Sequence, residues 1–248
     1  IVNKYIIDGK EYYKPKKKLK AKKIIAEIKF ICLPKEEFIK IVNILKENNL
    51  QVLSFYCSSY IKSFSYIDSF LENKFITFLD IGLDRTTIIF FINQKLDSMN
   101  SIPIGGNNIS KDISQIMRLT LEESEELKKT FNKSEIDFSY NDSDLNENKK
   151  IINKIIGKNI SIDLLKKVVL SRIEEIIKLS FNSISIPNNI DMKQNLNLVL
   201  IGKGSKIFNK NSFQIENKYN FKEINFYEED DLEICESGLK FGKNFEDN

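Results

Sequence analysis

The chain has 248 residues, 42% of them hydrophobic, which is enough to bury a core in one large domain or two medium ones. Its 38 basic and 35 acidic residues leave a net charge of +3, and this near balance gives no indication of nucleic-acid binding. The sequence contains no histidine, which excludes a histidine-ligated zinc site and histidine-dependent catalysis, and no apolar run approaches the roughly 20 residues that span a bilayer.

The three cysteines, Cys32, Cys57 and Cys235, lie far apart and form no CxxC pair. We therefore expect buried thiols in a reducing compartment. The chain starts at Ile1, in the middle of an apolar pattern, and we expect an N-terminal part of the protein to precede it.

Residues 5–9 predict a strand followed by a turn. The basic run 14–23, KPKKKLKAKK, is typical of a solvated loop that leads into a strand. A nucleic-acid contact is the alternative, but it would need aromatic or arginine partners, and only Tyr12 and Tyr13 are near.

A block of alternating strands and helices follows the basic run. Residues 24–33 predict a strand that ends at Pro34, and apolar residues recur with helical spacing over 35–48. Residues 50–57 predict a second strand, and residues 58–72 a second helix with a serine cap. This β-α-β-α order predicts a small α+β subdomain.

Residues 75–93 predict two apolar strands joined by a tight corner, and this hairpin is the strongest signal in the chain. The corner reads Asp80-Ile81-Gly82 and is followed by Thr86, and the pattern resembles the phosphate hairpin of the actin-like ATPases. Glycine there lets backbone N–H groups approach phosphate oxygens. A plain hairpin turn between two core strands remains the alternative.

The corner departs from the actin-like consensus at four positions. Leu83 and Asp84 replace two glycines, Arg85 replaces a threonine, and Thr87 replaces the closing aspartate. Leu83 adds a Cβ where close approach is needed, and Asp84 adds a negative charge beside a polyphosphate, while Arg85 offers a cation. The fold signal is therefore stronger than the signal for nucleotide binding.

The rest of the chain predicts a mixture of helices and one further strand. Thr120 and Glu123 have the spacing of a capping box. In chain order the expected elements are a strand that ends near Ile104, helices over 110–118 and 120–132, an irregular stretch over 134–150, a long helix over 163–183, a loop over 188–195, a buried strand over 196–201 and a short helix within 232–242.

Five motifs in this order resemble FtsA, a family of actin-like proteins of bacterial cell division. They are the entry into the block at 21–30, IPIGGNNISKDI at 102–113, LEESEELK at 121–128, SRIEEI at 171–176 and VLIGKGS at 199–205. The resemblance implies an α/β, actin-like (ribonuclease H-like) ATPase fold with a small α+β insertion subdomain of the SHS2 kind. It also implies four parts: the end of a first actin-like half (1–17), the insertion subdomain (18–73), a second half (74–119 and 196–248) and a lobe (120–195).

The resemblance further implies ATP with Mg²⁺ as cofactor. Asp80 and Gly82 would face the phosphates and the metal, and Arg172 and Glu175 would contact the nucleoside, although an exposed ion pair on one helix face is the alternative for the latter two. A helix N-terminus at Gly105 would favour anions. The full set of implied nucleotide-site residues is Asp80, Gly82, Thr86, Gly105, Gly106, Arg172, Glu175, Gly202, Lys203 and Gly204.

The function implied by the resemblance is that of an adaptor and not an enzyme. FtsA binds the C-terminal tail of FtsZ, tethers the Z-ring to the inner face of the cytoplasmic membrane at the division site, forms protofilaments, and recruits other division proteins through its insertion subdomain. Its membrane helix should lie beyond Asn248. The main alternative is PilM, an actin-like adaptor of type IV pilus assembly. A sugar kinase or chaperone ATPase is disfavoured by the insertion subdomain.

We expect the FtsZ-tail site in the lobe over 120–195. Its long helix offers the basic residues Lys166, Lys167, Arg172 and Lys178 beside apolar Val169, Ile173 and Ile177. An acidic and hydrophobic peptide would place apolar anchors on such a surface, with basic groups at the rim. The alternative is that the apolar residues belong to the core and the lysines are only solvated.

Overall fold

The computed structural model describes residues 2–12, 20–130, 161–186, 196–207, 221–227 and 231–246. It divides the chain into two compact units, which are described separately. The small unit comprises residues 1–65 and 234–248, and the large unit comprises residues 66–233. The irregular stretch expected over 134–150 and the loop expected over 188–195 lie outside the described residues.

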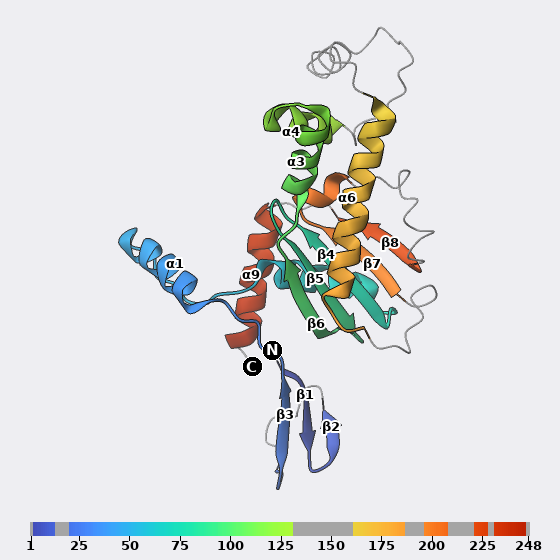
Figure 1. The fold of residues 1–248 in the computed structure, drawn as a ribbon. Helices are drawn as coiled ribbons and strands as arrows, with labels where there is room; N and C mark the ends of the chain where they lie inside the picture. Colours follow the sequence, from blue (N-terminus) through green and yellow to red (C-terminus); the bar gives the residue numbers. More distant parts are fainter. Residues whose placement is uncertain are drawn as a thin grey trace. The chain divides into compact units, whose positions relative to one another are not determined.

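The small unit contains a three-stranded antiparallel sheet in the order β2-β1-β3 (Figure 1). The strands are β1 (Val2–Ile7), β2 (Lys10–Tyr12) and β3 (Ile24–Ile28). The carboxylate of Asp8 accepts hydrogen bonds from the backbone N–H groups of Lys22 and Lys23, and this fixes the entry into β3. The first strand predicted for the insertion block therefore pairs with β1.

Three helices accompany this sheet in the small unit: α1 (Lys35–Glu47), α2 (Ser58–Tyr66) and most of α9 (Asp231–Glu246). Phe241 of α9 packs edge-to-face against Tyr56, Tyr60 and Phe64, with ring centroids 5.2–5.7 Å apart. Such pairs add stability beyond the apolar area that they bury. The aromatic cluster thus joins the C-terminal helix to α2.

The prediction of a strand over 50–57 is wrong for the described structure. Residues 51–57 belong to no strand or helix, and α1, which precedes them, buries none of its residues. A strand exists only where a neighbour satisfies its backbone N–H and C=O groups. The apolar composition of the segment favoured a strand but could not supply that neighbour.

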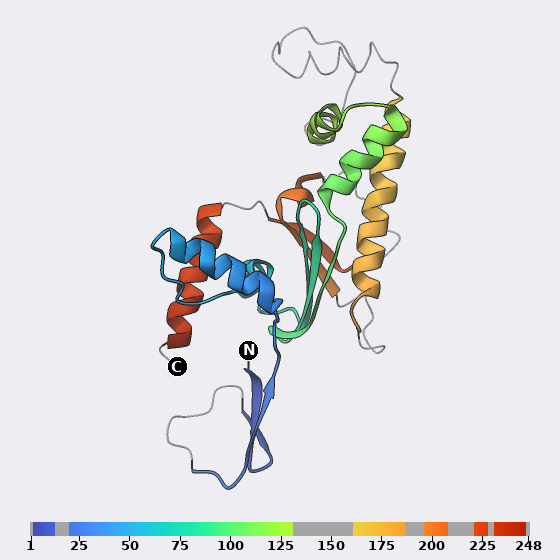
Figure 2. The same ribbon diagram turned by 60° about the vertical axis from the view of Figure 1, so that its left-hand side comes forward.

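The large unit is built on a five-stranded sheet in the order β6-β5-β4-β7-β8 (Figures 1 and 2). The strands β6, β5 and β4 are antiparallel, whereas β7 and β8 continue the sheet in parallel with β4. The strand bounds are Phe75–Ile81 for β4, Thr86–Ile92 for β5, Lys95–Ile102 for β6, Leu196–Ile201 for β7 and Glu223–Phe226 for β8.

Helices α3 (Gly106–Met117), α4 (Leu121–Thr130) and α6 (Ile162–Asn182) complete the large unit, with 3-10 turns at Ile67–Phe70 (η1) and Lys203–Ile207 (η2). In both views α6 runs along one face of the sheet beside α3 (Figures 1 and 2). Alternate residues of β4, β5 and β7 pack against α3 and α6 in one core. Burying each large apolar side chain there contributes about 1.5–3 kcal/mol.

The helices confirm several details of the sequence. The predicted capping box forms at α4, where Thr120 N–H donates to Glu123 Oε2 at 2.9 Å and Glu123 N–H donates to Thr120 Oγ1 at 3.2 Å. Helix α3 starts four residues earlier than expected, at Gly106, because Asn108 Oδ1 accepts the N–H of Gly105 and caps the helix there. The helix predicted over 58–72 is α2 followed by η1.

The expectation of buried thiols is wrong. Cys32 and Cys235 are exposed and Cys57 is half-buried, and all three are free. Free cysteine is among the most often buried residue types, which favoured the expectation, but the wide spacing of these three carries no information about where each side chain lies.

Candidate functional site

The β4–β5 hairpin places a tight turn at the carboxyl end of the central strand. Gly82 N–H donates to Arg85 O at 2.9 Å and closes the turn, and Asp80 is buried just before it. The side chains of Leu83, Asp84 and Arg85 are exposed. Among the described contacts the backbone N–H groups of these three residues donate to no acceptor, so the tip presents free amides of the kind that bind phosphate.

The turn that precedes α3 packs directly on this hairpin. A Cβ added to Gly105 would lie 2.6 Å from Leu83 O and 2.7 Å from both Gly82 O and Arg85 N. A Cβ added to Gly106 would lie 3.5 Å from Gly82 O. Only a glycine at position 105 allows the two backbones to approach this closely.

Strand β7 pairs with β4 on the side opposite β5, and the turn that follows β7 packs against the same hairpin. Gly202 has a φ of +90°, and a Cβ there would lie 2.5 Å from both Ile81 O and Asp80 Oδ1. A Cβ on Gly204 would lie 2.7 Å from Ile81 O. Three glycine turns from distant parts of the chain therefore converge on the end of β4, and we call them the glycine cluster. It contains Gly82, Gly105, Gly106, Gly202 and Gly204.

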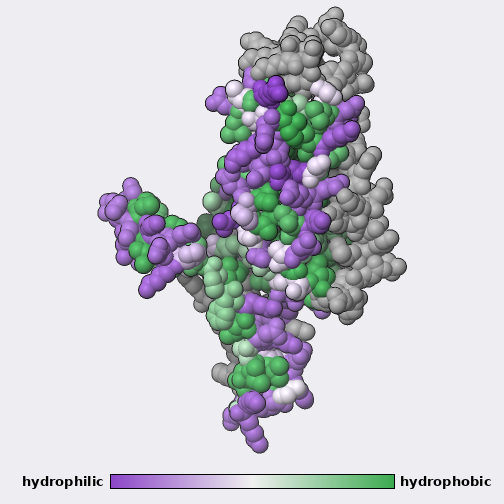
Figure 3. Space-filling model, viewed as in Figure 1, coloured by the Kyte–Doolittle hydropathy of each residue, from purple (hydrophilic) through white to green (hydrophobic). Residues whose placement is uncertain are grey.

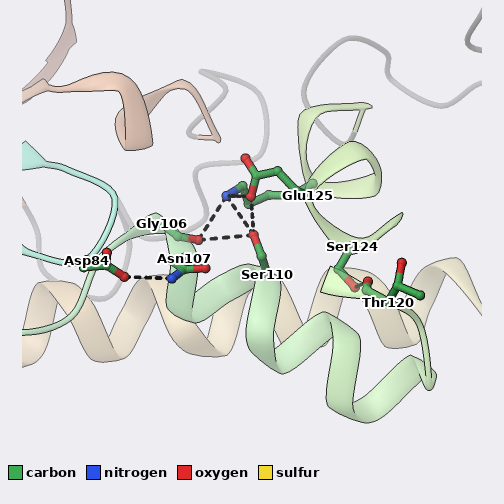
Figure 4. A network of polar contacts seen from close by, with 8 residues as sticks. Asp84, Gly106, Asn107, Ser110, Thr120, Ser124 and Glu125 are labelled. Carbon is green, nitrogen blue, oxygen red and sulfur yellow. Dashed lines mark hydrogen bonds and ion pairs between the residues drawn. The ribbon is translucent and has the colours of Figure 1, made fainter. Parts of the chain in front are cut away.

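The first amides of α3 are already used by the hairpin. Gly106 N–H donates to Gly82 O at 2.9 Å, and Asn107 N–H donates to Leu83 O at 2.7 Å. The Asn107 side chain donates to Asp84 Oδ1 at 2.7 Å (Figure 4). The helix N-terminus, which the sequence predicted as an anion site, thus holds the hairpin in place through its own donors.

The predicted site residue Thr86 has a structural contact. Its side chain is fully buried, and Oγ1 donates to Ile104 O at 2.7 Å. The hydroxyl therefore ties β5 to the connection between β6 and α3, which carries Gly105.

A charged group on α4 lies against the glycine cluster and was not predicted. Lys128 Nζ donates to Gly106 O at 3.0 Å and to Ser110 Oγ at 2.8 Å, and it forms an ion pair with Glu125 Oε2 at 2.5 Å. Figure 4 shows Gly106, Ser110 and Glu125 around this contact. The spacing of three between Glu125 and Lys128 was visible in the sequence, but only the fold shows that this pair reaches α3.

The electrostatics of this network favour ionised groups. Burial alone would raise the pKa of Glu125, but hydrogen bonds from Lys128 and Ser110 and the charge of Lys128 lower the pKa below its usual value. The network therefore places a carboxylate and an ammonium group, both oriented, beside the turns of the glycine cluster.

Arg172 and Glu175 lie in a different place from the glycine cluster. Arg172 makes a bidentate ion pair with Asp112 of α3, at 2.5 and 2.8 Å, and donates to Glu175 Oε2 at 2.6 Å. The hydrogen bond to Asp112 is the main cause that raises the pKa of Arg172. No described contact joins these residues to the glycine cluster, and the ion pair predicted as the alternative is present.

A shallow groove of about 340 Å³ runs between α3 and α6 beside this ion pair. We call it the α3–α6 groove, and Figure 3 shows hydrophobic side chains bordered by hydrophilic ones on this face. It is lined by Asp112, Ile116, Lys167, Val168, Ser171, Arg172 and Glu175.

The apolar anchors predicted for the FtsZ tail are wrong. Val169, Ile173 and Ile177 are 0–2% exposed and pack in the core of the large unit. The repeat of apolar residues at three and four positions is the same for a core-facing stripe and a docking stripe, and α6 uses it to cover the sheet. Ile116 of α3 and Leu164 of α6 are exposed apolar side chains of the two helices that form the groove.

Lys203 begins η2 and forms an ion pair with Asp231 at 2.9 Å, with both side chains largely exposed. Such a surface pair contributes little to stability. Among the described residues no three acidic, histidine or cysteine side chains gather in a way that would hold a metal ion, so the magnesium site stays a prediction. None of the described helices is long and apolar enough to cross a membrane.

Comparisons with known proteins agree with this fold. The family model "Cell division protein FtsA" matches residues 77–211, more than half of the chain. The cell division protein FtsA of Bacillus subtilis (strain 168) is 25% identical over 183 residues, which cover 72% of this chain and 40% of that protein. The chain thus spans less than half the length of this relative.

Two solved structures show the same architecture. MreB 5 of Spiroplasma citri bound to AMPPNP matches 87% of this chain and 68% of its own, with a TM-score of 0.60 and 18% identity. The PilM–PilN type IV pilus biogenesis complex matches 81% of this chain and 49% of its own, with a TM-score of 0.51 and 16% identity. At these identities the likeness shows the fold alone. The sheet order, the glycine cluster and the family match lead to one conclusion: the chain belongs to the FtsA family and has the actin-like α/β fold.

Proposed function

We propose that this chain serves in cell division as an actin-like adaptor that binds ATP weakly, catalyses no reaction, and docks the C-terminal tail of FtsZ. The family membership supports the setting, and the glycine cluster is the observation that supports nucleotide binding. The cluster is a place where backbone from three turns comes close enough to line a ligand without side chains in the way.

In this proposal the residues around the end of β4 hold the nucleotide. The free amides of the hairpin tip hold the phosphates, the turn of Gly202 and Gly204 lies beside the nucleoside, and Glu125 and Lys128 offer an acceptor and a donor to it. The bound nucleotide would undergo no reaction, and its only contribution would be a charged contact between this chain and a binding partner. MreB 5 of Spiroplasma citri was solved with AMPPNP, a nucleotide of the same class.

Binding is expected to be weak because the hairpin departs from a good phosphate cradle. Asp84 puts a carboxylate at the tip, and the first amides of α3 are occupied by Gly82 O and Leu83 O. Isothermal titration of the chain with Mg-ATP measures this directly. A dissociation constant in the micromolar range would contradict weak binding.

The α3–α6 groove is the surface that we propose for the FtsZ tail. Ile116 is 50% exposed and Leu164 is 43% exposed, so a peptide can contact these apolar side chains without opening the core of the large unit. Lys167 lines the groove and Lys166 is exposed beside it on α6, and both attract an acidic peptide to the rim. The site keeps the predicted lobe and the basic residues Lys166, Lys167 and Arg172, but it leaves out Lys178 and replaces the buried anchors.

The test is a titration of the chain into a labelled peptide with the sequence of the cognate FtsZ tail, read by fluorescence anisotropy. Lys166→Glu with Lys167→Glu should weaken binding at low salt and reduce its salt dependence. Ile116→Ser should weaken binding equally at low and high salt. Lys178→Glu, on an exposed position of the same helix outside the groove, is the control and should have a much smaller effect.

Unchanged affinity in both groove variants would refute this surface while leaving the family membership intact. We also propose self-association into protofilaments, contacts of the insertion subdomain expected over 18–73 with other division proteins, and a location at the division site on the inner face of the membrane. Sedimentation of the chain with and without nucleotide tests the self-association, and imaging of a fluorescent fusion tests the location. A fusion spread evenly through dividing cells would contradict the location.

A further inference from the structure

The tip of the β4–β5 hairpin carries a carboxylate that is held in position. Asp84 Oδ1 accepts a hydrogen bond from Asn107 Nδ2 at 2.7 Å (Figure 4). Asn107 is itself fixed, because its backbone N–H donates to Leu83 O at 2.7 Å. A negative charge of defined position therefore stands at the same turn as the free amides of residues 83–85.

Little positive charge opposes this carboxylate. Lys128 of α4 reaches the first turn of α3, where its ammonium group donates to Gly106 O, but that group is paired with Glu125 at 2.5 Å. Arg85 is exposed, and its guanidinium forms no ion pair within the described part of the chain. The first amides of α3 donate to Gly82 O and Leu83 O, which are neutral acceptors, so they cannot also donate to a phosphate.

We propose that Asp84 makes this site discriminate against an additional phosphate, so that the chain takes a nucleoside diphosphate in preference to a nucleoside triphosphate. The inference rests on the proposed function, which puts the phosphates of a nucleotide at the hairpin tip. A triphosphate brings one more anionic group to the turn than a diphosphate does. Repulsion between like charges a few ångströms apart at a solvated surface corresponds to about a five-fold loss of affinity.

The experiment titrates the ¹⁵N-labelled full chain with ADP and with ATP, each at the same Mg²⁺ concentration, and follows amide chemical shifts, which report dissociation constants up to the millimolar range. The original chain should bind ADP about five-fold more tightly than ATP. Asp84→Asn removes the charge and keeps an oxygen acceptor for Asn107, so the preference should fall to near unity, mainly because ATP binds more tightly.

Asp68→Asn is the matched control. It removes the same charge from an exposed aspartate in η1, which precedes the opposite end of β4 from the hairpin, and it should leave the ratio of the two dissociation constants unchanged. Arg85→Gln tests the neighbouring positive charge on its own. It should lower the affinity for both nucleotides without reversing the preference for ADP.

The proposal is overturned if the original chain binds ATP as tightly as ADP, or if Asp84→Asn leaves the ratio unchanged. It is also overturned if Asp84→Asn weakens ATP only when Mg²⁺ is present, since the carboxylate would then hold the metal. The ADP titration alone separates this inference from the proposed function. If ADP does not bind at all, the nucleotide site itself is refuted, whereas ADP binding with no preference refutes only the role of Asp84.

Discussion

Substituting Gly202 by alanine tests the closest approach in the glycine cluster. The φ of +90° costs an L-residue about 1–2 kcal/mol. The new Cβ would also lie 2.5 Å from Ile81 O, and overpacking of this kind costs about 1–3 kcal/mol. The loss of freedom in the unfolded chain returns about 0.4–1 kcal/mol. We therefore expect Gly202→Ala to lower the free energy of unfolding of the large unit by about 1–5 kcal/mol.

Two other glycines separate the cost of the positive φ from the cost of the close contact, and a third serves as a control. Gly9 has a φ of +82° with nothing within 4 Å of an added Cβ, so Gly9→Ala reports the backbone cost alone, in the small unit. Gly105 has a φ of −150°, which any residue adopts, so Gly105→Ala reports the contact cost alone. Gly238 lies within α9 with open space around it, and Gly238→Ala should stabilise by about 0.5–1 kcal/mol.

Two measurements are combined: urea unfolding of the chain followed by circular dichroism, and hydrogen exchange of the β4 and β7 amides. The exchange rates report the stability of the large unit separately from that of the small one. The reasoning fails if Gly202→Ala unfolds within about 0.5 kcal/mol of the original chain, the range of ordinary surface substitutions. It also fails if Gly105→Ala has no effect on the large unit, because the three backbone contacts would then relax without cost.

Three further substitutions follow from the contacts. Burial raises the pKa of Tyr60 to about 12, so its contribution to stability is complete below pH 10 and is lost as the pH rises toward 12; Tyr60→Phe should suppress this alkaline loss in a pH-dependent unfolding series. The lowered pKa of Glu125 contributes stability above its ordinary pKa that is lost as the pH falls, so Glu125→Gln should be destabilising at neutral pH and neutral in acid, and an equal effect at both would contradict the Lys128 contact. Asp112→Ala leaves Arg172 half-buried with Glu175 alone and should lower the free energy of unfolding by about 1–3 kcal/mol, as measured in urea, whereas a neutral result would show that the bidentate pair is worth no more than a surface pair.

Local signals in the sequence predicted most of the large unit. The hairpin followed from two apolar runs around Gly82, the capping box from Thr120 and Glu123, and β7 from a mostly apolar segment at 196–201. Each of these depends on neighbours a few residues away. Their assembly into one candidate site followed from the family resemblance, since the resemblance gave the order of the motifs.

Features that depend on distant partners were missed. Nothing near Lys128 in the sequence shows that α4 turns its ammonium group onto Gly106. The apolar spacing around Val169 is compatible with a core or a docking face, and only the sheet beneath α6 decides between them. The segment 51–57 had the composition of a strand, but pairing is a property of two segments and not of one.

The parallel pairing of β4 with β7 has a consequence for how the chain assembles. The strands β4, β5 and β6 are joined by short turns, so this part of the sheet closes only small loops. Phe75 and Leu196, by contrast, are partners about 120 residues apart, and such closure is entropically slow. During synthesis one edge of β4 therefore stays unpaired, with apolar side chains uncovered, until β7 has left the ribosome. Chaperone dependence and aggregation of truncated products are the expected results for a chain that ends before residue 196.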